Sequence, residues 1–303
     1  MGFDLDDEPK KETKPTAKAT TKAEAKAPAP VEDDSFNLEK IKSFWTEDNE
    51  LKEKLVCLLY GSDGTAKSGI ALDCLTDEDI KAGMRAMVID LDGGNIPLII
   101  RQHKARCEKL GRKVNDVYLV RNPVAMNVET GDVDYKKTFL NIKEAIFLAK
   151  HNHKELNLKF IVYDGLSTAL KYAEYQMRVE KHLQTDGGVQ LLYWLIRNKI
   201  FKEILDQVKA LPISSFYIAH EDFILKELSD NSSIKEATNS MMHQKIRCVR
   251  IDNKVKGIVE FKATIDKSKY VPESEGSSFT ILSVDKNEKT ATWETKNLFK
   301  SLI

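Results

Sequence analysis

Short apolar runs alternate with stretches of helical periodicity through the middle of the chain. The apolar runs predict buried strands, which we place at residues 55–60, 86–91, 117–120, 160–163 and 213–219. Between the runs, apolar residues recur every three to four positions, which predicts helices over residues 67–80, 96–110, 135–151, 166–183 and 189–210. Strands that alternate with helices predict an α/β fold, a mostly parallel sheet with helices on both faces.

The pattern changes after residue 245, where apolar and polar residues begin to alternate. This alternation predicts strands over residues 255–265, 279–284 and 290–293. We expect them to form hairpins that add antiparallel strands to an edge of the sheet. The predicted fold is therefore one α/β domain with a β-rich C-terminal end.

The first 35 residues have a different composition from the rest of the chain. They contain six lysines, six alanines, four prolines and nine acidic residues, with Phe3 as the one aromatic residue. Such a segment buries too little apolar surface to offset the entropy of ordering it, so we predict a disordered charged tail over residues 1–35 and a folded domain over residues 36–303. The tail is a candidate site for a protein partner, and the apolar segment Phe36–Trp45 is a candidate for docking onto a neighbouring subunit.

Charge and composition exclude several classes of protein. The chain of 303 residues has 47 basic and 47 acidic residues, so it is not a histone-like protein that neutralises phosphates over its whole surface. No apolar run approaches the roughly 18 residues that a membrane helix needs, and the charged N-terminus does not fit a secretory signal. The four cysteines lack the spacing of a metal site, so we expect reduced thiols in a cytoplasmic protein without a membrane partner.

One segment between a predicted strand and a predicted helix carries a phosphate-binding pattern. It fits G-x-x-x-x-G-K-[ST] except that alanine replaces the second glycine, and its residues are Gly61, Ser62, Asp63, Gly64, Thr65, Ala66, Lys67, Ser68 and Gly69. In such a loop the backbone N–H groups surround phosphate oxygens, the lysine reaches the β- and γ-phosphates, and the serine hydroxyl binds Mg²⁺. The segment predicts an ATP site with Mg²⁺. An ordinary glycine-rich turn is the alternative.

Two acidic strand ends add to this prediction. The run Lys159–Asp164 ends in an acid, as a Walker B strand does, so Asp164 is predicted to hold Mg²⁺ and to accept a hydrogen bond from Ser68. A simple helix cap is the other interpretation of Asp164. The run that ends at Asp90 continues with Leu-Asp92-Gly-Gly. Here the sequence resembles the RecA-like ATPases, and the resemblance implies that Asp92 is the base that orients the attacking water. An Asp-Gly turn without a catalytic role is the alternative.

The same resemblance implies two further roles. The strand that ends Phe-Tyr-Ile-Ala-His220-Glu221 is similar to the small RecA-like ATPases of bacteriophages, including those associated with single-strand annealing, which implies a γ-phosphate sensor at His220. Oligomeric RecA-like ATPases bring a lysine or arginine into the neighbouring subunit's site, which implies that role for Lys267 and Lys269. A structural histidine and lysines that block aggregation are the alternatives. An oligomer or filament is expected.

The resemblance covers roughly residues 50–270 and implies an ATPase that acts on DNA. The segments 172–188 and 221–245 contain aromatic and basic residues that suit single-stranded DNA, by stacking and by phosphate contacts. We expect a role in phage-type recombination, annealing or replication in a prokaryotic or phage-infected cell. Three alternatives stay open: a DNA-packaging or helicase-type motor, a signalling ATPase that binds protein instead of nucleic acid, and a protein that binds nucleotide without hydrolysing it.

Overall fold

The computed structural model describes residues 54–93, 96–184, 187–221 and 241–294, all within one compact unit. The predicted tail (1–35), the apolar segment 36–45 and most of the second predicted substrate segment (222–240) lie outside the described residues. The predictions for those segments, including the boundary at residue 36, stay predictions.

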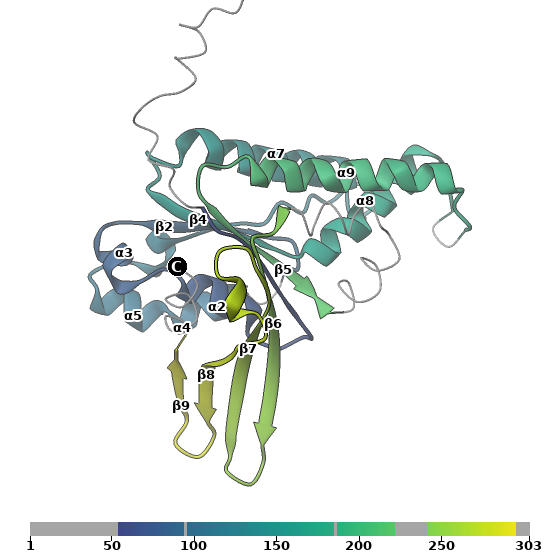
Figure 1. Cartoon of the computed structure of the whole chain (residues 1–303). Helices are drawn as coiled ribbons and strands as arrows, with labels where there is room; N and C mark the ends of the chain where they lie inside the picture. The colour runs from purple at the N-terminus through teal and green to yellow at the C-terminus, as the bar shows by residue number, and fades with distance from the viewer. Residues whose placement is uncertain (1–53, 94–95, 185–186, 222–240, 295–303) are drawn as a thin grey trace, which may run out of the picture. The chain divides into compact units, whose positions relative to one another are not determined.

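One sheet forms the centre of the described unit (Figure 1). Its strands lie in the order β3-β2-β4-β5-β1-β6-β7-β8-β9. In chain order their bounds are β1 Val56–Gly61, β2 Arg85–Asp90, β3 Tyr118–Arg121, β4 Leu158–Asp164, β5 Ser214–His220, β6 Gln244–Asn253, β7 Ile258–Ser268, β8 Ser278–Asp285 and β9 Thr290–Trp293. All pairs from β3 to β6 are parallel, and β7, β8 and β9 continue the sheet as antiparallel strands. The predicted α/β fold with antiparallel C-terminal strands is confirmed.

Helices cover both faces of the parallel part of the sheet. The long helices on one face are α7 Tyr135–Asn152, α8 Leu166–Glu180 and α9 Leu191–Lys209. The shorter helices that pack on the other face are α2 Lys67–Asp73, α3 Asp77–Lys81, α4 Ile96–Gln102, α5 Lys104–Lys109 and α6 Val114–Val117. Each face has its own apolar core, to which alternate residues of the strands contribute, as Leu58 and Leu59 of β1 show. A strand with both faces buried carries no polar stripe, which explains the continuous apolar runs in the sequence.

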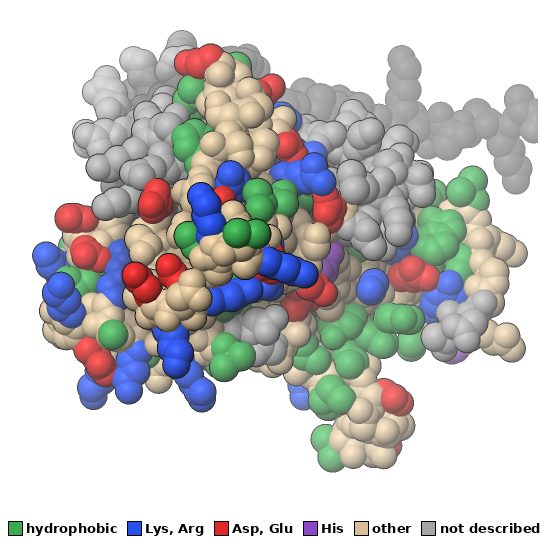
Figure 2. All heavy atoms as spheres, turned by 90° about the horizontal axis from the view of Figure 1, so that it is seen from below, with side chains coloured by type: hydrophobic (Ala, Val, Ile, Leu, Met, Phe, Trp, Pro, Cys, Tyr) green, Lys and Arg blue, Asp and Glu red, His purple; other side chains and the backbone are tan. Residues whose placement is uncertain are grey.

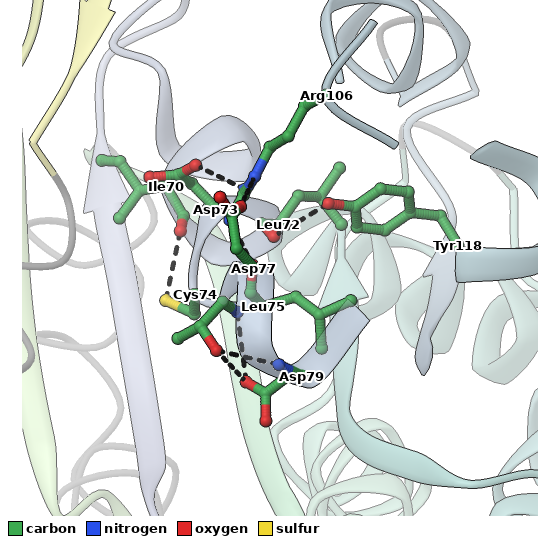
Figure 3. Close-up of polar contacts among 10 residues, drawn as sticks. Ile70, Leu72, Asp73, Cys74, Leu75, Asp77, Asp79, Arg106 and Tyr118 are labelled. Atoms are coloured by element: carbon green, nitrogen blue, oxygen red, sulfur yellow. Dashed lines mark hydrogen bonds and ion pairs between the residues drawn. The ribbon is translucent and has the colours of Figure 1, made fainter. Parts of the chain in front are cut away.

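The predicted helix over residues 67–80 is wrong, because the chain breaks into α2 and α3. Thr76 caps α3: its Oγ1 accepts a hydrogen bond from the Asp79 backbone N–H, and the Asp79 carboxylate accepts one from the Thr76 N–H. Figure 3 shows how Arg106 of α5 fixes this corner. Its guanidinium binds Asp73 at 3.0 Å and Asp77 at 2.6 Å and donates to the Leu75 carbonyl at 2.9 Å.

The predicted helix over residues 96–110 is also divided, at His103, into α4 and α5. The His103 side chain turns inward and is buried. Apolar spacing continues across the break, so periodicity alone does not reveal it.

The predicted strand over residues 255–265 is wrong in its bounds and incomplete. Val255 lies in the turn between β6 and β7 and is 98% exposed. The turn ends at Gly257, whose φ of 70° favours glycine. The sequence pattern also does not reveal β6, which runs parallel to β1 with Leu59 opposite Ile246. The antiparallel additions therefore begin with β7.

All four cysteines are described, and none forms a disulfide. Cys57, Cys107 and Cys248 are buried, and Cys74 is half-buried. They are free thiols that pack within the apolar core on one face of the sheet.

Candidate functional site

The phosphate-binding pattern forms the connection between β1 and α2. Two of its residues have left-handed backbone conformations, Gly64 at φ 69° and Ala66 at φ 64°. The conformation at Ala66 costs an L-residue roughly 1–2 kcal/mol relative to the right-handed region. The chain therefore adopts at alanine the conformation for which the usual glycine of this pattern is suited, and the substitution does not remove the turn.

Lys67 is the first residue of α2, and its side chain turns back over the loop. Its Nζ donates hydrogen bonds to the carbonyls of Gly61 at 2.9 Å and Ser62 at 2.7 Å. The side chain is buried, and this burial lowers the pKa of Lys67 from its ordinary value. A buried ammonium whose partners are neutral carbonyls gains from an anion placed beside it.

Ser68 and Asp164 meet across the loop, although 96 positions separate them. The Ser68 Oγ donates a hydrogen bond to Asp164 Oδ2 at 2.6 Å. Asp164 ends β4, which β5 separates from β1 in the sheet. The carboxyl ends of these parallel strands share one edge, and the first turn of α2 brings the hydroxyl over to that edge. A hydroxyl and a carboxylate are oxygen ligands of the kind that Mg²⁺ takes alongside phosphate oxygens and water.

The carboxyl group of Asp164 has an unusual protonation equilibrium. Its pKa is raised to about 7, first by burial and then by the nearby Asp92 and Asp90 carboxylates, against the opposing effects of Ser68 and Lys67. Burial also raises the pKa of Asp90. An excess of carboxylates over cations at a strand edge favours the binding of a divalent cation. Within the described part of the chain, no group of three or more His, Cys, Asp or Glu side chains is placed to hold a metal by itself.

This pKa predicts a pH-dependent stability for the chain without ligands. The folded Asp164 binds a proton up to about pH 7, whereas an unfolded one loses it near the ordinary 3.8. The stability that this proton contributes is thus fully present below pH 3.8, the pKa of the unfolded Asp164, and is lost as the pH rises through about 7, the pKa of the folded one. Asp164→Asn stays neutral at every pH. We therefore expect its melting temperature, relative to the wild type, to be higher at pH 8 than at pH 5, by the equivalent of about 2–3 kcal/mol.

Thermal denaturation at both pH values, in the absence of divalent cations, measures this difference. Glu129→Gln, a neutralised carboxylate on an exposed turn, is the matched control and is expected to show no pH-dependent gain. If Asp164→Asn changes the melting temperature equally at pH 5 and pH 8, the pKa of Asp164 is not raised.

Asp92 and His220 lie beside the loop as a linked pair. Thr168 of α8 donates a hydrogen bond to Asp92 Oδ1. His220, at the end of β5, has its Nδ1 2.8 Å from Asp63 Oδ1 in the loop and its Nε2 3.6 Å from Asp92 Oδ2. The imidazole thus connects the phosphate-binding loop to Asp92. The structure brings these predicted residues together, while their roles as base and sensor stay predictions.

Glu221, the residue after His220, forms a second connection to the phosphate-binding loop. The Ser62 Oγ donates to Glu221 Oε2 at 3.2 Å, and the Arg247 guanidinium of β6 binds Glu221 Oε1. Glu221 is therefore held by a cation and by the loop, whereas Asp92 faces a hydroxyl and an imidazole.

Most of these residues line one cleft of about 800 Å³, whereas Ser62, Glu221 and Arg247 are not among its lining residues. The loop from Asp63 to Gly69, Asp90, Asp92, Asp164 and His220 form its polar part. Its apolar part is formed by residues that the sequence patterns do not single out: Leu98, Ile99, Phe261, Leu282, Val284 and Trp293. The C-terminal strands β7, β8 and β9 thus contribute a wall of the cleft. Their alternating pattern predicts strands but not which side chains face a distant loop.

Lys267 and Lys269 are not among the residues that line this cleft. Lys267 lies opposite Lys245 on β6, and the Lys269 N–H donates to the His243 carbonyl at 2.8 Å. The His243 N–H in turn donates to the carbonyl of Val56 at the start of β1. At about 3.3 Å per residue, this end of β1 lies on the order of 17 Å from Gly61. The two lysines are therefore outside the site of their own chain.

The first predicted substrate segment is partly occupied by internal contacts. Arg178 binds Glu174 at 2.8 Å and donates to the carbonyls of Gln184 and Gly187, so it holds the turn after α8 in place. Tyr172 and Tyr175 form an aromatic cluster with Tyr135, whose ring centroid lies 5.4 Å from each of theirs. Tyr172 also lines the cleft, so this aromatic cluster is adjacent to the predicted ATP site.

We found no family model and no curated protein that matches the sequence. Among solved structures, the chain is similar to the RadB recombinase, with a TM-score of 0.45, 13% identity, and 78% of this chain and 89% of that chain covered. It is also similar to a KaiC-like protein from the hyperthermophilic archaeon Pyrococcus horikoshii OT3, with a TM-score of 0.42, 13% identity, and 79% and 89% covered. Neither likeness is close enough to assign a function. In the described residues, no helix has the length and apolar character to span a bilayer.

Proposed function

We propose that the chain is a RecA-like P-loop ATPase that binds ATP with Mg²⁺, hydrolyses it and acts on DNA. The observation that carries the proposal is the hydrogen bond between Ser68 and Asp164 beneath a loop that also presents the buried Lys67. The serine of the loop and the acid at the end of β4 are 96 positions apart in the sequence, and the fold brings them into contact. Their contact is the arrangement that a Mg²⁺–nucleotide site requires.

Each residue of the site has a distinct task in this proposal. Backbone N–H groups from Gly64 to Ser68 and the Lys67 ammonium bind the phosphates, at the positive end of α2. Ser68 and Asp164 would hold Mg²⁺, which supplies positive charge beside the phosphates. Asp92 accepts the proton of the attacking water, and His220 responds to the γ-phosphate. The raised pKa of Asp164 fits a role in holding Mg²⁺, since a cation beside this carboxyl would favour its charged form.

A role on DNA is supported by the surroundings of the site. The Tyr135, Tyr172 and Tyr175 cluster offers aromatic surface next to the cleft, and Lys181 is exposed at the end of α8. Stacking and phosphate contacts of this kind suit single-stranded DNA. Figure 2 shows the molecule from below, where basic and acidic side chains are interspersed over part of the surface.

The experiment that tests this function is ATP turnover measured without DNA, with single-stranded DNA and with double-stranded DNA. We expect single-stranded DNA to stimulate turnover most, as the proposed recombination, annealing or replication role of the phage type requires. Preference for double-stranded DNA would favour a packaging or helicase-type motor. Turnover that neither single-stranded nor double-stranded DNA changes would favour a signalling ATPase that binds protein. Binding of ATP without turnover in any of the three would contradict hydrolysis.

The placement of Lys267 and Lys269 supports a role between subunits. Because they lie outside their own chain's cleft, a neighbour's site is the one that they would complete. Replacing both by Ala is expected to leave ATP binding unchanged and to lower turnover roughly tenfold, because a cation supplied in trans stabilises charge on the transferred phosphoryl group. Mixing with Lys67→Ala protein should restore part of the activity, since that protein has a dead site but an intact lysine pair.

Lys254→Ala with Lys256→Ala removes the same charge from the turn of the same hairpin and serves as the control. Absence of rescue on mixing would contradict the intersubunit role. Loss of solubility at unchanged turnover would show instead that the lysine pair only protects a strand edge from aggregation.

A further inference from the structure

Gly69 has a spatial reason to be glycine. It is the third residue of α2, directly after Ser68, and its φ is not among the positive values of the described residues. A Cβ built at Gly69 would lie 2.5 Å from Cη2 and 3.2 Å from Cζ2 of Trp293. A helix-interior glycine costs about 1 kcal/mol relative to alanine. The glycine is therefore explained by the close approach of the Trp293 ring and not by backbone conformation.

Trp293 is fixed on its other sides as well. It is the last residue of β9 and pairs with Leu282 on β8. Its ring centroid lies 6.0 Å from that of the buried His103, which in turn lies 5.5 Å from Tyr118. The Tyr118 hydroxyl donates to the Leu72 carbonyl in α2 at 3.4 Å. The indole thus contacts α2 directly at Gly69 and is linked to α2 a second time, through His103 and Tyr118, at Leu72.

We propose that Trp293 is a positioning residue for the phosphate-binding loop. The edge of its indole ring sets the place of the first turn of α2, and with it the places of Lys67 and Ser68. Trp293 and Gly69 both line the cleft, so the C-terminal hairpin forms a wall of the nucleotide site and also determines where the loop stands. The inference rests on the proposed function, because nucleotide binding is its readout.

A double-substitution experiment tests this contact. Gly69→Ala places a methyl group where the indole lies, and it should weaken ATP–Mg²⁺ binding at least about tenfold, because small displacements of binding groups are costly. Trp293→Leu should weaken binding less. The double variant should bind more tightly than Gly69→Ala alone, since the shorter leucine leaves room for the methyl group. Thr292→Ala, at the exposed neighbouring position on β9, is the control and should bind as the wild type does.

Affinity is measured by titration calorimetry and stability by melting temperature, on the full chain. If Gly69→Ala does not fold, recovery of folding in the double variant supports the contact, and a comparison of Trp293→Leu with the milder Trp293→Phe then tests positioning. A second readout uses Trp45→Phe with Trp194→Phe, which leaves Trp293 as the one tryptophan among the three of the sequence. ATP–Mg²⁺ is expected to change its fluorescence.

The outcomes separate this inference from the proposed function. A wild-type chain that binds neither ATP nor ADP would overturn the proposed function and the inference with it. A wild type that binds ATP while the two substitutions have additive effects on affinity would overturn the inference alone. Melting temperatures that fall while every affinity stays at the wild-type value would also overturn it, because the tryptophan would then be structural only.

Discussion

Lys67→Ala is expected to weaken ATP binding at least about a hundredfold, because it removes a charge-assisted contact to phosphate worth about 3 kcal/mol. The structure indicates that the fold should tolerate the change. The ammonium is buried against two neutral carbonyls, those of Gly61 and Ser62, and burial lowers its pKa. The lost hydrogen bonds and the avoided burial of a charge thus act on stability in opposite directions.

Titration calorimetry gives the affinity of this variant, and circular dichroism with a melting curve shows whether it is folded. Lys199→Ala removes an exposed lysine from α9 and is the matched control, expected to bind ATP normally. A folded Lys67→Ala protein with wild-type affinity for ATP would falsify the assignment of the phosphate-binding loop.

Asp92→Asn should separate binding from hydrolysis. The amide keeps the size of the carboxylate and can still accept a hydrogen bond from Thr168, so ATP should bind with nearly unchanged affinity. It cannot take a proton from water, and turnover should fall about 10³-fold, within the range that general bases contribute. The quantity to measure is the rate of single-turnover hydrolysis with the protein in saturating excess over ATP, which is independent of affinity.

Glu221→Gln is the comparison for Asp92→Asn. The Glu221 carboxylate already binds Arg247 through one oxygen and accepts a hydrogen bond from Ser62 through the other, so both of its oxygens have partners within the chain. We expect this variant to retain much more activity than Asp92→Asn. If Asp92→Asn hydrolyses ATP at the wild-type rate while Glu221→Gln does not, the base is Glu221, and the role assigned to Asp92 is wrong.

The parts of the site that the sequence predicts are those carried by local pattern. The loop from Gly61 to Gly69 is contiguous, and its strand and helix follow from the apolar residues around it. Asp164 is distant in sequence, yet its place at the end of a buried strand is enough to predict the edge at which it meets Ser68, because parallel strands align their carboxyl ends. The same reasoning places His220.

The parts that the sequence does not predict depend on how the elements pack against one another in the tertiary structure. The alternating residues of β9 predict a strand, but whether Trp293 faces the core, solvent or Gly69 depends on how the hairpin lies against α2. The break between α2 and α3 has a local signal, the capping box of Thr76 and Asp79, which the apolar spacing across it conceals. The parallel direction of β6 has no local signal, because it depends on the route by which the chain returns to β1.

The most direct test of the central claim is a calorimetric titration of ATP into the wild-type chain, with and without Mg²⁺. We predict one nucleotide bound per chain, tighter binding when Mg²⁺ is present, and loss of that Mg²⁺ dependence in Asp164→Ala, which removes the carboxylate under Ser68. Absence of binding, or binding that neither Mg²⁺ nor the Asp164 substitution changes, would contradict a P-loop nucleotide site in this cleft.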